Sequence, residues 1–247
     1  MTNPLNSQLY NLFDILPAHI LPFLQWLAQD YKLPYPLHFL DVGCGPGRLL
    51  QPCAALGWQV DALEPDADYY AAAAQIARQS ANITVRQGGF EAIEIHTGYD
   101  LIAAINAPFA YLLTMAARLD ALNRIFHALK PGGVLFLDMF NFLWILRHYR
   151  PPQESILHTE SGDAIRRVVH HQIDWHDSTF THTDTFYRND ERISTQIHRM
   201  AIITLQELQH LVATVGFERI QTYNNFAARK SQRINKGRIM LSAQKPL

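Results

Sequence analysis

Short apolar runs alternate along the chain with longer stretches in which apolar residues recur every three or four positions. The short runs predict buried strands at residues 36–43, 58–64, 82–87, 98–106 and 134–140. The longer stretches predict helices at residues 17–31, 47–57, 66–79 and 113–130, the last ending at Pro131-Gly132-Gly133. Repeated strand–helix units with strands that are apolar on both faces indicate a parallel sheet covered by helices on both sides.

The pattern changes after about residue 140. Residues 165–203 are rich in β-branched and aromatic residues with turn-like breaks near 177–178 and 189–190, which predicts two or three antiparallel strands inserted as a small sheet. A helix is expected again at 203–216, because Thr204 and Glu207 have capping-box spacing and Gly216 suits the end of the helix. Two closing strands are then expected at residues 217–226 and 237–244.

Composition narrows the class of protein. The chain has 247 residues, 48% of them hydrophobic, which is enough for one sizeable core and excludes a disordered or fibrous chain. With 21 basic and 22 acidic residues, the formal net charge of -1 gives no electrostatic footprint for nucleic acid or an anionic membrane. The N-terminal stretch fits neither a signal peptide nor a membrane span. We therefore expect a cytoplasmic protein without a membrane or nucleic-acid partner.

A glycine-rich turn, from Asp41 to Gly47, joins the first predicted core strand to the helix after it. Its glycines are two residues apart, whereas a dinucleotide fingerprint has the third glycine three residues after the second. Pro46 removes an amide that a pyrophosphate would use, and Asp41 would repel phosphate. An acid at this turn suits a cationic ligand, such as the ammonium group of an amino acid. Glu64 ends the next predicted strand, where a carboxylate can accept hydrogen bonds from two ribose hydroxyls.

Four segments follow one another in a familiar order, FLDVGCGPGRLL, VDALEPD, YDLIAAINAPFAYLL and LKPGGVLFLDMFN. They resemble the successive motifs of class I S-adenosylmethionine-dependent methyltransferases, and the tail from His198 onward resembles that of the small-molecule members. The resemblance covers about residues 35–140 and 198–245. It implies S-adenosylmethionine as the cofactor, S-adenosylhomocysteine as its product, and a small-molecule acceptor.

The resemblance also implies roles for individual residues. The methionine part of the cofactor would be surrounded by Asp41 and the turn residues, which are Gly43, Cys44, Gly45 and Gly47. Glu64 would bind the ribose hydroxyls, with Pro65 and Asp66 beside the adenine. Asn106 and Ala107 would flank the cofactor near the methyl group. Tyr10 would cover the bound cofactor as part of an N-terminal lid.

The loop after the third core strand departs from the family pattern. Members usually have an acid there that faces the adenine amino group, and the segment RQGGFEA lacks it at the expected place. Backbone groups at Gly89 and apolar contact from Phe90 would replace the acid. The departure affects one side-chain contact and leaves the cofactor assignment in place.

Catalytic residues are harder to assign, because methyl transfer mainly requires alignment of the acceptor and demands no fixed dyad. The candidates are Tyr111, His148 and His171, together with loop polar residues that equally suit structural roles, Asn106, Asp138 and Asn141. The Asn106-Ala107-Pro108-Phe109 segment resembles the motif of enzymes that methylate nucleic-acid or amide nitrogens. Ala107 breaks that motif, so such targets are disfavoured.

Histidines gather in the predicted insertion. In one continuous strand His170, His176 and His182 would share a face and a metal cluster would be conceivable. A turn near Asp177 separates them, and no cysteine or acid completes a recognisable site, so no metal is expected. Arg199, just before the penultimate helix, is expected to pair with Asp138 or with an acidic group of the substrate.

Taken together, these patterns predict an α/β fold with a Rossmann-like, seven-stranded, mostly parallel sheet, helices on both faces and a small antiparallel β insertion after the fifth strand. Residues 1–247 would form one methyltransferase domain, with an N-terminal cap (1–34), a cofactor-binding core (35–140), a substrate-lid insertion (141–200) and closing elements (201–247). The protein would methylate a nitrogen or oxygen of a small molecule as a monomer or homodimer. A catalytically silent relative that binds the cofactor, or an NAD-type oxidoreductase, remains the alternative.

Overall fold

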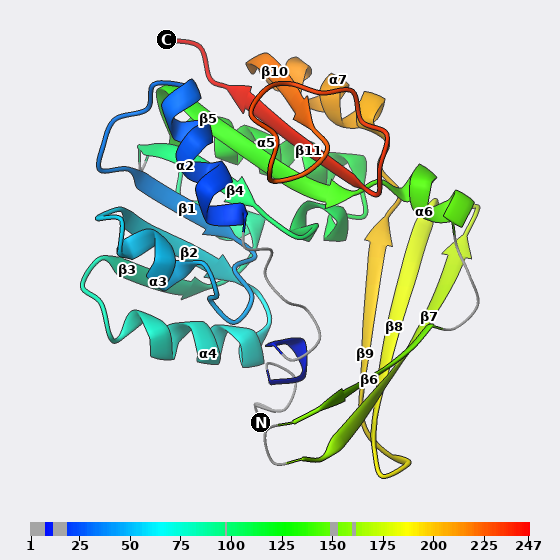
Figure 1. Cartoon of the computed structure of the whole chain (residues 1–247). Coiled ribbons are helices and arrows are strands. Elements are labelled where there is room, and N and C mark those ends of the chain that lie inside the picture. The colour runs from blue at the N-terminus through cyan, green and yellow to red at the C-terminus, as the bar shows by residue number, and fades with distance from the viewer. Residues whose placement is uncertain (1–7, 12–18, 97, 149–152, 160–161) are drawn as a thin grey trace.

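The computed structural model describes residues 8–11, 19–96, 98–148, 153–159 and 162–247. Seven strands form one sheet in the order β10-β11-β5-β4-β1-β2-β3, and four strands form a second sheet beside it (Figure 1). The strands of the larger sheet are β1 His38–Val42, β2 Gln59–Glu64, β3 Ile83–Gln87, β4 Tyr99–Ala104, β5 Leu129–Phe140, β10 Glu218–Tyr223 and β11 Arg238–Gln244. The first five strands pair in parallel, and β11 is antiparallel to both β5 and β10. The predicted fold class is confirmed.

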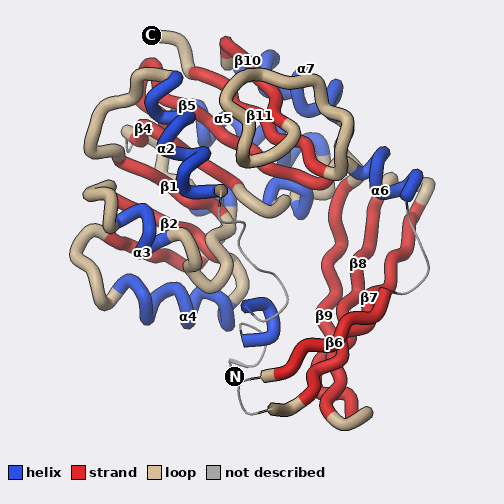
Figure 2. Tube along the Cα trace, viewed as in Figure 1, coloured by secondary structure: helices blue, strands red, loops and turns tan. Residues whose placement is uncertain are grey.

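Helices cover both faces of the larger sheet (Figure 2). A separate apolar core is buried on each face. One core contains residues of the helices α2 Ile20–Asp30, α3 Leu50–Ala54 and α4 Ala67–Ala77. The other contains residues of the short helix η1 Phe90–Ala92 and of α5 Met115–Ala128 and α7 Leu205–Val215. The strands between these cores are therefore apolar on both sides, as expected for a doubly covered sheet.

The ends of α7 follow from the predicted capping residues. The Thr204 side chain accepts a hydrogen bond from the amide of Glu207 at 3.1 Å, and Gly216 ends the helix in the left-handed region with φ 106°. The Glu207 carboxylate pairs with Arg118 of α5. Capping thus fixes α7, and an ion pair links it to α5.

One boundary in the core differs from the expectation. Strand β5 begins at Leu129 and runs through Pro131-Gly132-Gly133, which was predicted to be a break before the strand. The Gly132 amide donates to the carbonyl of Lys245 at 3.0 Å, and the Lys245 amide donates to the carbonyl of Gly133 at 2.9 Å. Partners at the end of the chain, far away in sequence, therefore hold this segment extended.

The inserted sheet has four antiparallel strands, β6 Gln153–His158, β7 Ala164–Asp174, β8 Thr179–Arg188 and β9 Glu191–Ala201. The predicted breaks are the turns that join β7 to β8 and β8 to β9. Strand β6 was not predicted, because all of its residues are exposed and it lacks a buried face. Phe180 and Met200 of the inserted sheet pack with Phe142 of α6 Phe142–His148 and Ala110 of η2 Pro108–Tyr111, which joins the two sheets through an apolar contact.

Within the described ranges, no helix is both long and apolar enough to cross a membrane.

Candidate cofactor and acceptor site

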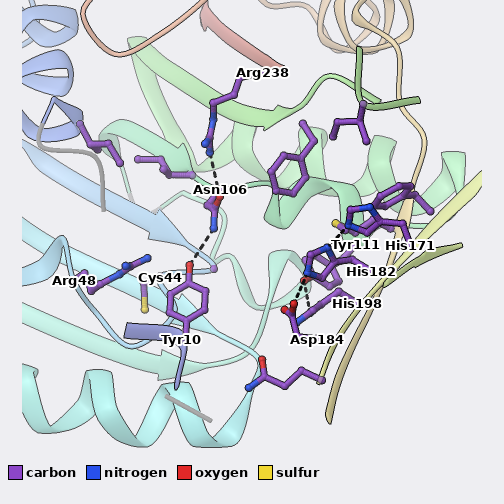
Figure 3. A pocket seen from close by; sticks show the side chains of 18 of the residues that line it. Tyr10, Cys44, Arg48, Asn106, Tyr111, His171, His182, Asp184, His198 and Arg238 are labelled. Carbon is purple, nitrogen blue, oxygen red and sulfur yellow. Dashed lines mark hydrogen bonds and ion pairs between the residues drawn. The ribbon is translucent and has the colours of Figure 1, made fainter. Parts of the chain in front are cut away.

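A pocket of about 700 Å³ opens between the two sheets. One side is formed at the carboxyl ends of β1 and β4, where Asp41, Gly43, Cys44 and Asn106 line it. The opposite side is the inner face of β7, β8 and β9, where the lining residues include His171, His182 and His198 (Figure 3). Ligands of open α/β sheets bind at the carboxyl ends of the strands, so the position is the expected one.

The three glycines of the turn after β1 have different structural roles. All have positive φ, 75° at Gly43, 58° at Gly45 and 87° at Gly47. A Cβ at Gly43 would lie 2.6 Å from the Cβ of Pro108, and one at Gly47 would lie 2.9 Å from Cδ1 of Leu50. At Gly45 a Cβ would meet only Tyr10, at 3.9 Å. Gly43 and Gly47 therefore allow close packing of neighbouring segments, and Gly45 leaves room for a ligand.

Two buried acids lie beside this turn. Asp41, next to the last residue of β1, is 3% exposed, and burial together with the nearby Glu64 carboxylate raises its pKa to about 7. Glu64 ends β2 and accepts hydrogen bonds from the amides of Gly45 at 2.7 Å and Asp66 at 2.9 Å. Burial raises the pKa of Glu64 even though these two amides stabilise its charged form. Each carboxylate oxygen has a further lone pair with which to accept a ligand hydroxyl.

Asn106 connects four segments of the chain. Its amide donates to Asp138 of β5 at 2.9 Å, which holds the residue in the left-handed region at φ 70°. Arg238 of β11 makes two hydrogen bonds to Asp138, at 2.8 and 2.7 Å, and donates to the Asn106 side-chain oxygen at 3.1 Å. The oriented Asn106 amide group then donates to the hydroxyl of Tyr10 at 3.0 Å (Figure 3). Tyr10 is thereby held over the turn.

Sequence reasoning missed Arg48 and Arg238. The Arg48 guanidinium lies 4.6 Å from the centre of the Tyr10 ring and lines the pocket. Arg48 could have been found from its position directly after Gly47, because a side chain there reaches the pocket next to the turn. Arg238 had no local signal, because its partners Asp138 and Asn106 come from strands more than 90 residues earlier. Arg199, which was expected to pair with Asp138, instead pairs with Asp177 at 3.1 Å and donates to Thr179.

The loop after β3 has an acid after all. The Glu91 carboxylate accepts a hydrogen bond from the Gly89 amide at 2.7 Å and so folds back over this loop. The Phe90 ring is buried in the core, 5.7 Å from the ring of Phe109. The Asp66 carboxylate caps α4 through the amides of Asp68 and Tyr69. The cofactor roles expected of Pro65, Asp66, Gly89 and Phe90 stay predictions.

Cys44 of the turn and Ala107 of the loop after β4 are apolar in character. Burial raises the pKa of the Cys44 thiol well above its usual range, so the thiol stays protonated. Ala107 is buried with φ 69° and belongs to the cluster that joins the two sheets. Cys44 therefore forms part of the pocket wall, and Ala107 belongs to the apolar contact between the two sheets.

Three histidines form a row across the inserted sheet. His171 of β7 lies opposite His182 of β8, which lies opposite His198 of β9. A β-bulge between Phe186 and Tyr187 shifts the register of β8 and β9 by one residue. Without this shift His182 would oppose Ile197, and His198 would point to the outer face. The bulge therefore places the third imidazole in the pocket.

The three predicted catalytic candidates all line the pocket but have different partners. The Tyr111 hydroxyl lies 2.7 Å from Nδ1 of His198. His171 bonds through Nε2 to Nδ1 of His182 at 2.8 Å. His148 stacks on Trp144 with ring centres 4.0 Å apart and bonds to that residue's carbonyl. Tyr111 and His171 thus belong to polar networks, and His148 belongs to an aromatic wall.

The remaining candidates have structural roles in this arrangement. The Asn141 side chain donates to the carbonyl of Lys236 at 2.8 Å. His170 is exposed and alternates with His171, so it is on the outer face, and His176 lies in the turn between β7 and β8. Across the part of the chain that the structure describes, no group of three or more metal-ligating side chains is close enough to hold a metal ion.

Known proteins match this chain over its core and, in part, over its whole length. Residues 39–133 match the family described as the methyltransferase domain. The chain is 32% identical over 109 residues to a ubiquinone biosynthesis O-methyltransferase of Nitrobacter winogradskyi, a match that covers 44% of this chain and only 40% of that protein. It is 28% identical over 210 residues to a glycine/sarcosine N-methyltransferase of Halorhodospira halochloris, covering 82% of this chain and 74% of that protein.

Solved structures share the complete fold. An S-adenosylmethionine-dependent methyltransferase from Clostridium acetobutylicum superposes with a TM-score of 0.80 at 14% identity, covering 99% of this chain and 100% of that one. The sugar N-methyltransferase KedS8 from a Streptoalloteichus species superposes with a TM-score of 0.78 at 15% identity, covering 98% and 93%. At these identities the likeness concerns the fold, inserted sheet included.

Residues 39–133 thus match the methyltransferase domain family, and the chain shares the fold of solved S-adenosylmethionine-dependent methyltransferases. Its methyltransferase domain family match spans β1 to the start of β5.

Proposed function

We propose that the protein transfers a methyl group from S-adenosylmethionine to an amine nitrogen of a small molecule, and that residues 1–247 act as one domain in doing so. The observation that carries the proposal is the continuous pocket that joins the motif turn to a chamber lined by imidazoles and aromatic rings. When bound, the cofactor supplies an electrophilic methyl group on a sulfonium centre.

The residues of the turn fit this cofactor. Asp41 offers a buried carboxylate to a cationic group, and Glu64 has lone pairs for two ribose hydroxyls. Arg48 offers a guanidinium to a carboxylate, and Glu91 offers an acceptor to an adenine amino group. Gly45 leaves the space that the ligand needs beneath Tyr10. Together, Asp41, Gly43, Cys44, Gly45 and Asn106 would surround the methionine part.

An amine is favoured over a hydroxyl as the acceptor. The curated match that extends through the inserted sheet is an N-methyltransferase, whereas the O-methyltransferase match covers only 44% of this chain. KedS8, whose fold matches along almost its whole length, is named a sugar N-methyltransferase. Because the inserted sheet lines the acceptor side of the pocket, similarity there bears more on the acceptor than similarity in the core does.

The residues of this chain position the acceptor and exclude water from its surroundings. Phe180 and Met200 give the chamber an apolar floor, and Trp144 forms one wall. Methyl transfer needs the amine to be aligned within about 3–3.5 Å of the methyl carbon and water to be excluded. These two effects supply most of the lowering of the activation barrier. Tyr10, held by Asn106, would close the cofactor side.

The test is incubation with S-adenosylmethionine and a panel of small amines and matched alcohols, with mass-spectrometric detection of methylated products. Methylation of amines, with loss of cofactor affinity by about 1–3 kcal/mol in Glu64→Ala, is the expected result. Methylation of the alcohols alone would contradict the choice of nitrogen. Tight cofactor binding without turnover on any acceptor would favour a catalytically silent relative, and binding of NAD in its place would favour an oxidoreductase.

A further inference from the structure

The histidine row continues into a buried ion pair. His182 bonds through Nδ1 to Nε2 of His171 at 2.8 Å and through Nε2 to Oδ1 of Asp184 at 2.9 Å. Arg167 holds both oxygens of Asp184, at 2.9 and 3.0 Å. Asp184 is 4% exposed. All four side chains line the acceptor side of the pocket (Figure 3 shows three of them).

The negative charge of Asp184 determines which imidazole nitrogens of His182 and His171 carry a hydrogen. Burial alone would raise the pKa of Asp184, but the hydrogen bonds from His182 and Arg167 outweigh it and lower the pKa to about 2. An ionised carboxylate only accepts, so Nε2 of His182 carries a hydrogen. When this is the one hydrogen on the His182 ring, Nδ1 of His182 accepts from Nε2 of His171, which leaves the lone pair of His171 on Nδ1.

His171 is neutral at physiological pH. Burial, followed by the neighbouring His182, lowers its pKa to about 4. The groups that face the His171–His182 pair are Asp184, Arg167, His198 and, through His198, Tyr111, while His170 acts on His171 only by its charge from the outer face. An uncharged imidazole on this wall is compatible with a cationic acceptor and a cationic cofactor in the same chamber.

We propose that His171 is the general base that removes a proton from the ammonium form of the acceptor, and that His182, held by Asp184 and Arg167, receives that proton. The N–H bond of the ammonium breaks and a bond to Nδ1 of His171 forms. The hydrogen on Nε2 of His171 moves to Nδ1 of His182. The lone pair left on the acceptor nitrogen would then form the new bond to the methyl carbon while the bond from that carbon to the sulfonium of the bound cofactor breaks, its electron pair passing to the sulfur, which becomes a neutral thioether.

The relay solves a difficulty that a single imidazole would face. His171 alone binds a proton weakly because it is buried. After the transfer the positive charge is on His182, whose Nε2 lies 2.9 Å from the Asp184 carboxylate. The proton returns through the same two imidazoles to solvent once the product leaves. The pair Tyr111–His198 lies beside this relay and would orient the acceptor.

This inference rests on the proposed amine methylation, and its first test needs no substrate. Nitrogen-15 NMR of the histidine side chains in the unliganded protein should show His171 and His182 both protonated at Nε2 and bare at Nδ1 at pH 7. The His171→Gln spectrum assigns the His171 signals. A hydrogen on Nδ1 of His171 would overturn the relay whether or not an acceptor is known.

The second test uses kinetics with a matched control. His171→Gln should bind S-adenosylhomocysteine within about twofold of the wild type, yet lose about 10²–10⁴-fold in kcat at pH 7. Its kcat/KM should rise about tenfold per pH unit toward the pKa of the acceptor amine, because only free amine can then react. His170→Gln, one residue away on the outer face, should behave like the wild type.

The outcomes separate the relay from the proposed function. A wild type that methylates no amine contradicts the proposed function. A wild type that methylates amines while His171→Gln does so equally well at pH 7 overturns the relay alone. A loss of activity in Tyr111→Phe or His198→Gln, with none in His171→Gln, would assign the base to that other pair and so also overturn the relay.

A rescue experiment adds a further test. Imidazole added to His171→Ala should restore activity.

Discussion

Asn106 is the residue on which the cofactor side of the pocket depends most. Its backbone is in the left-handed region, which costs alanine more free energy than asparagine, and its side chain links Arg238 to Tyr10. Backbone and side chain therefore make separable contributions. Two substitutions at this one position distinguish them.

We expect Asn106→Gly and Asn106→Ala to weaken binding of S-adenosylhomocysteine alike, because both lose the bond to Tyr10. Asn106→Ala should also be less stable than Asn106→Gly by about 1–2 kcal/mol, since only alanine is strained at φ 70°. Calorimetry and denaturant unfolding measure the two effects. Equal stability of the two variants would contradict the strain.

Asp41 should couple cofactor binding to pH. Its pKa of about 7 means that most molecules carry a protonated Asp41 at pH 6, whereas a cationic ligand favours the ionised form. Binding of S-adenosylhomocysteine at pH 6 should therefore release nearly one proton, and at pH 8.5 almost none. Calorimetry in buffers of different ionisation enthalpy measures this, and Asp41→Asn should abolish the difference.

The same raised pKa also makes the stability of the unliganded protein depend on pH. A carboxyl that binds its proton more tightly when folded than when unfolded stabilises the fold only while it is protonated. The contribution of Asp41 to stability should thus fall as pH rises from its ordinary value of 3.8 to about 7 and stay constant above. A wild type whose stability rose over this window relative to Asp41→Asn would contradict the assignment.

Among the secondary-structure elements, α5 and α7 show how an ion pair supports the site indirectly. Arg118 of α5 is 7% exposed, pairs with Glu207 of α7, and donates to the carbonyls of Leu112 at 2.9 Å and Leu113 at 3.0 Å. These carbonyls directly follow η2, which carries Tyr111. The buried guanidinium therefore fixes the end of a pocket-forming loop.

Arg118→Ala should reduce the free energy of unfolding by about 3–5 kcal/mol, because it leaves the partly buried Glu207 carboxylate and two carbonyls without their donor. Arg124 of the same helix pairs with Asp120 at the surface, and Arg124→Ala should cost less than about 0.5 kcal/mol. Denaturant unfolding of both variants makes the comparison. Similar losses in the two would show that burial of Arg118 is not decisive.

The elements also show what the sequence could predict. Local signals were sufficient for α7, where Thr204 and Gly216 mark both ends, and for Asp41 and Glu64, which lie at the carboxyl ends of consecutive strands. Strand β6 gave no signal because it buries no face. Arg238 gave none because its partners are distant in the chain.

The histidine row illustrates the limit most clearly. The alternation of side chains along one strand grouped His170, His176 and His182. The register between neighbouring strands instead groups His171, His182 and His198. Parity fails across the turn after Asp174, and the position of His198 depends on a one-residue bulge. Cross-strand register is a property of the folded sheet, so no single stretch of sequence contains it.

For the whole molecule, the important feature is that the pocket lies between two sheets that meet mainly through a small apolar cluster. A ligand that contacts both sides should therefore stabilise the entire protein. At a concentration of 100 times its Kd, S-adenosylhomocysteine should add about 2.7 kcal/mol, which corresponds to a rise in Tm of about 5–11 °C. Differential scanning calorimetry measures this, with NAD as the control. An equal rise with NAD would contradict cofactor selectivity.

The late position of β11 in the chain has a consequence for biosynthesis. This strand inserts between β5 and β10 and brings Arg238 to Asp138 and Asn106. Until a ribosome has released it, β5 has an unpaired edge and the residue that orients Asn106 is absent. A nascent chain that already contains every motif of the cofactor turn would therefore still lack a finished site, so cofactor cannot assist the early steps of its folding.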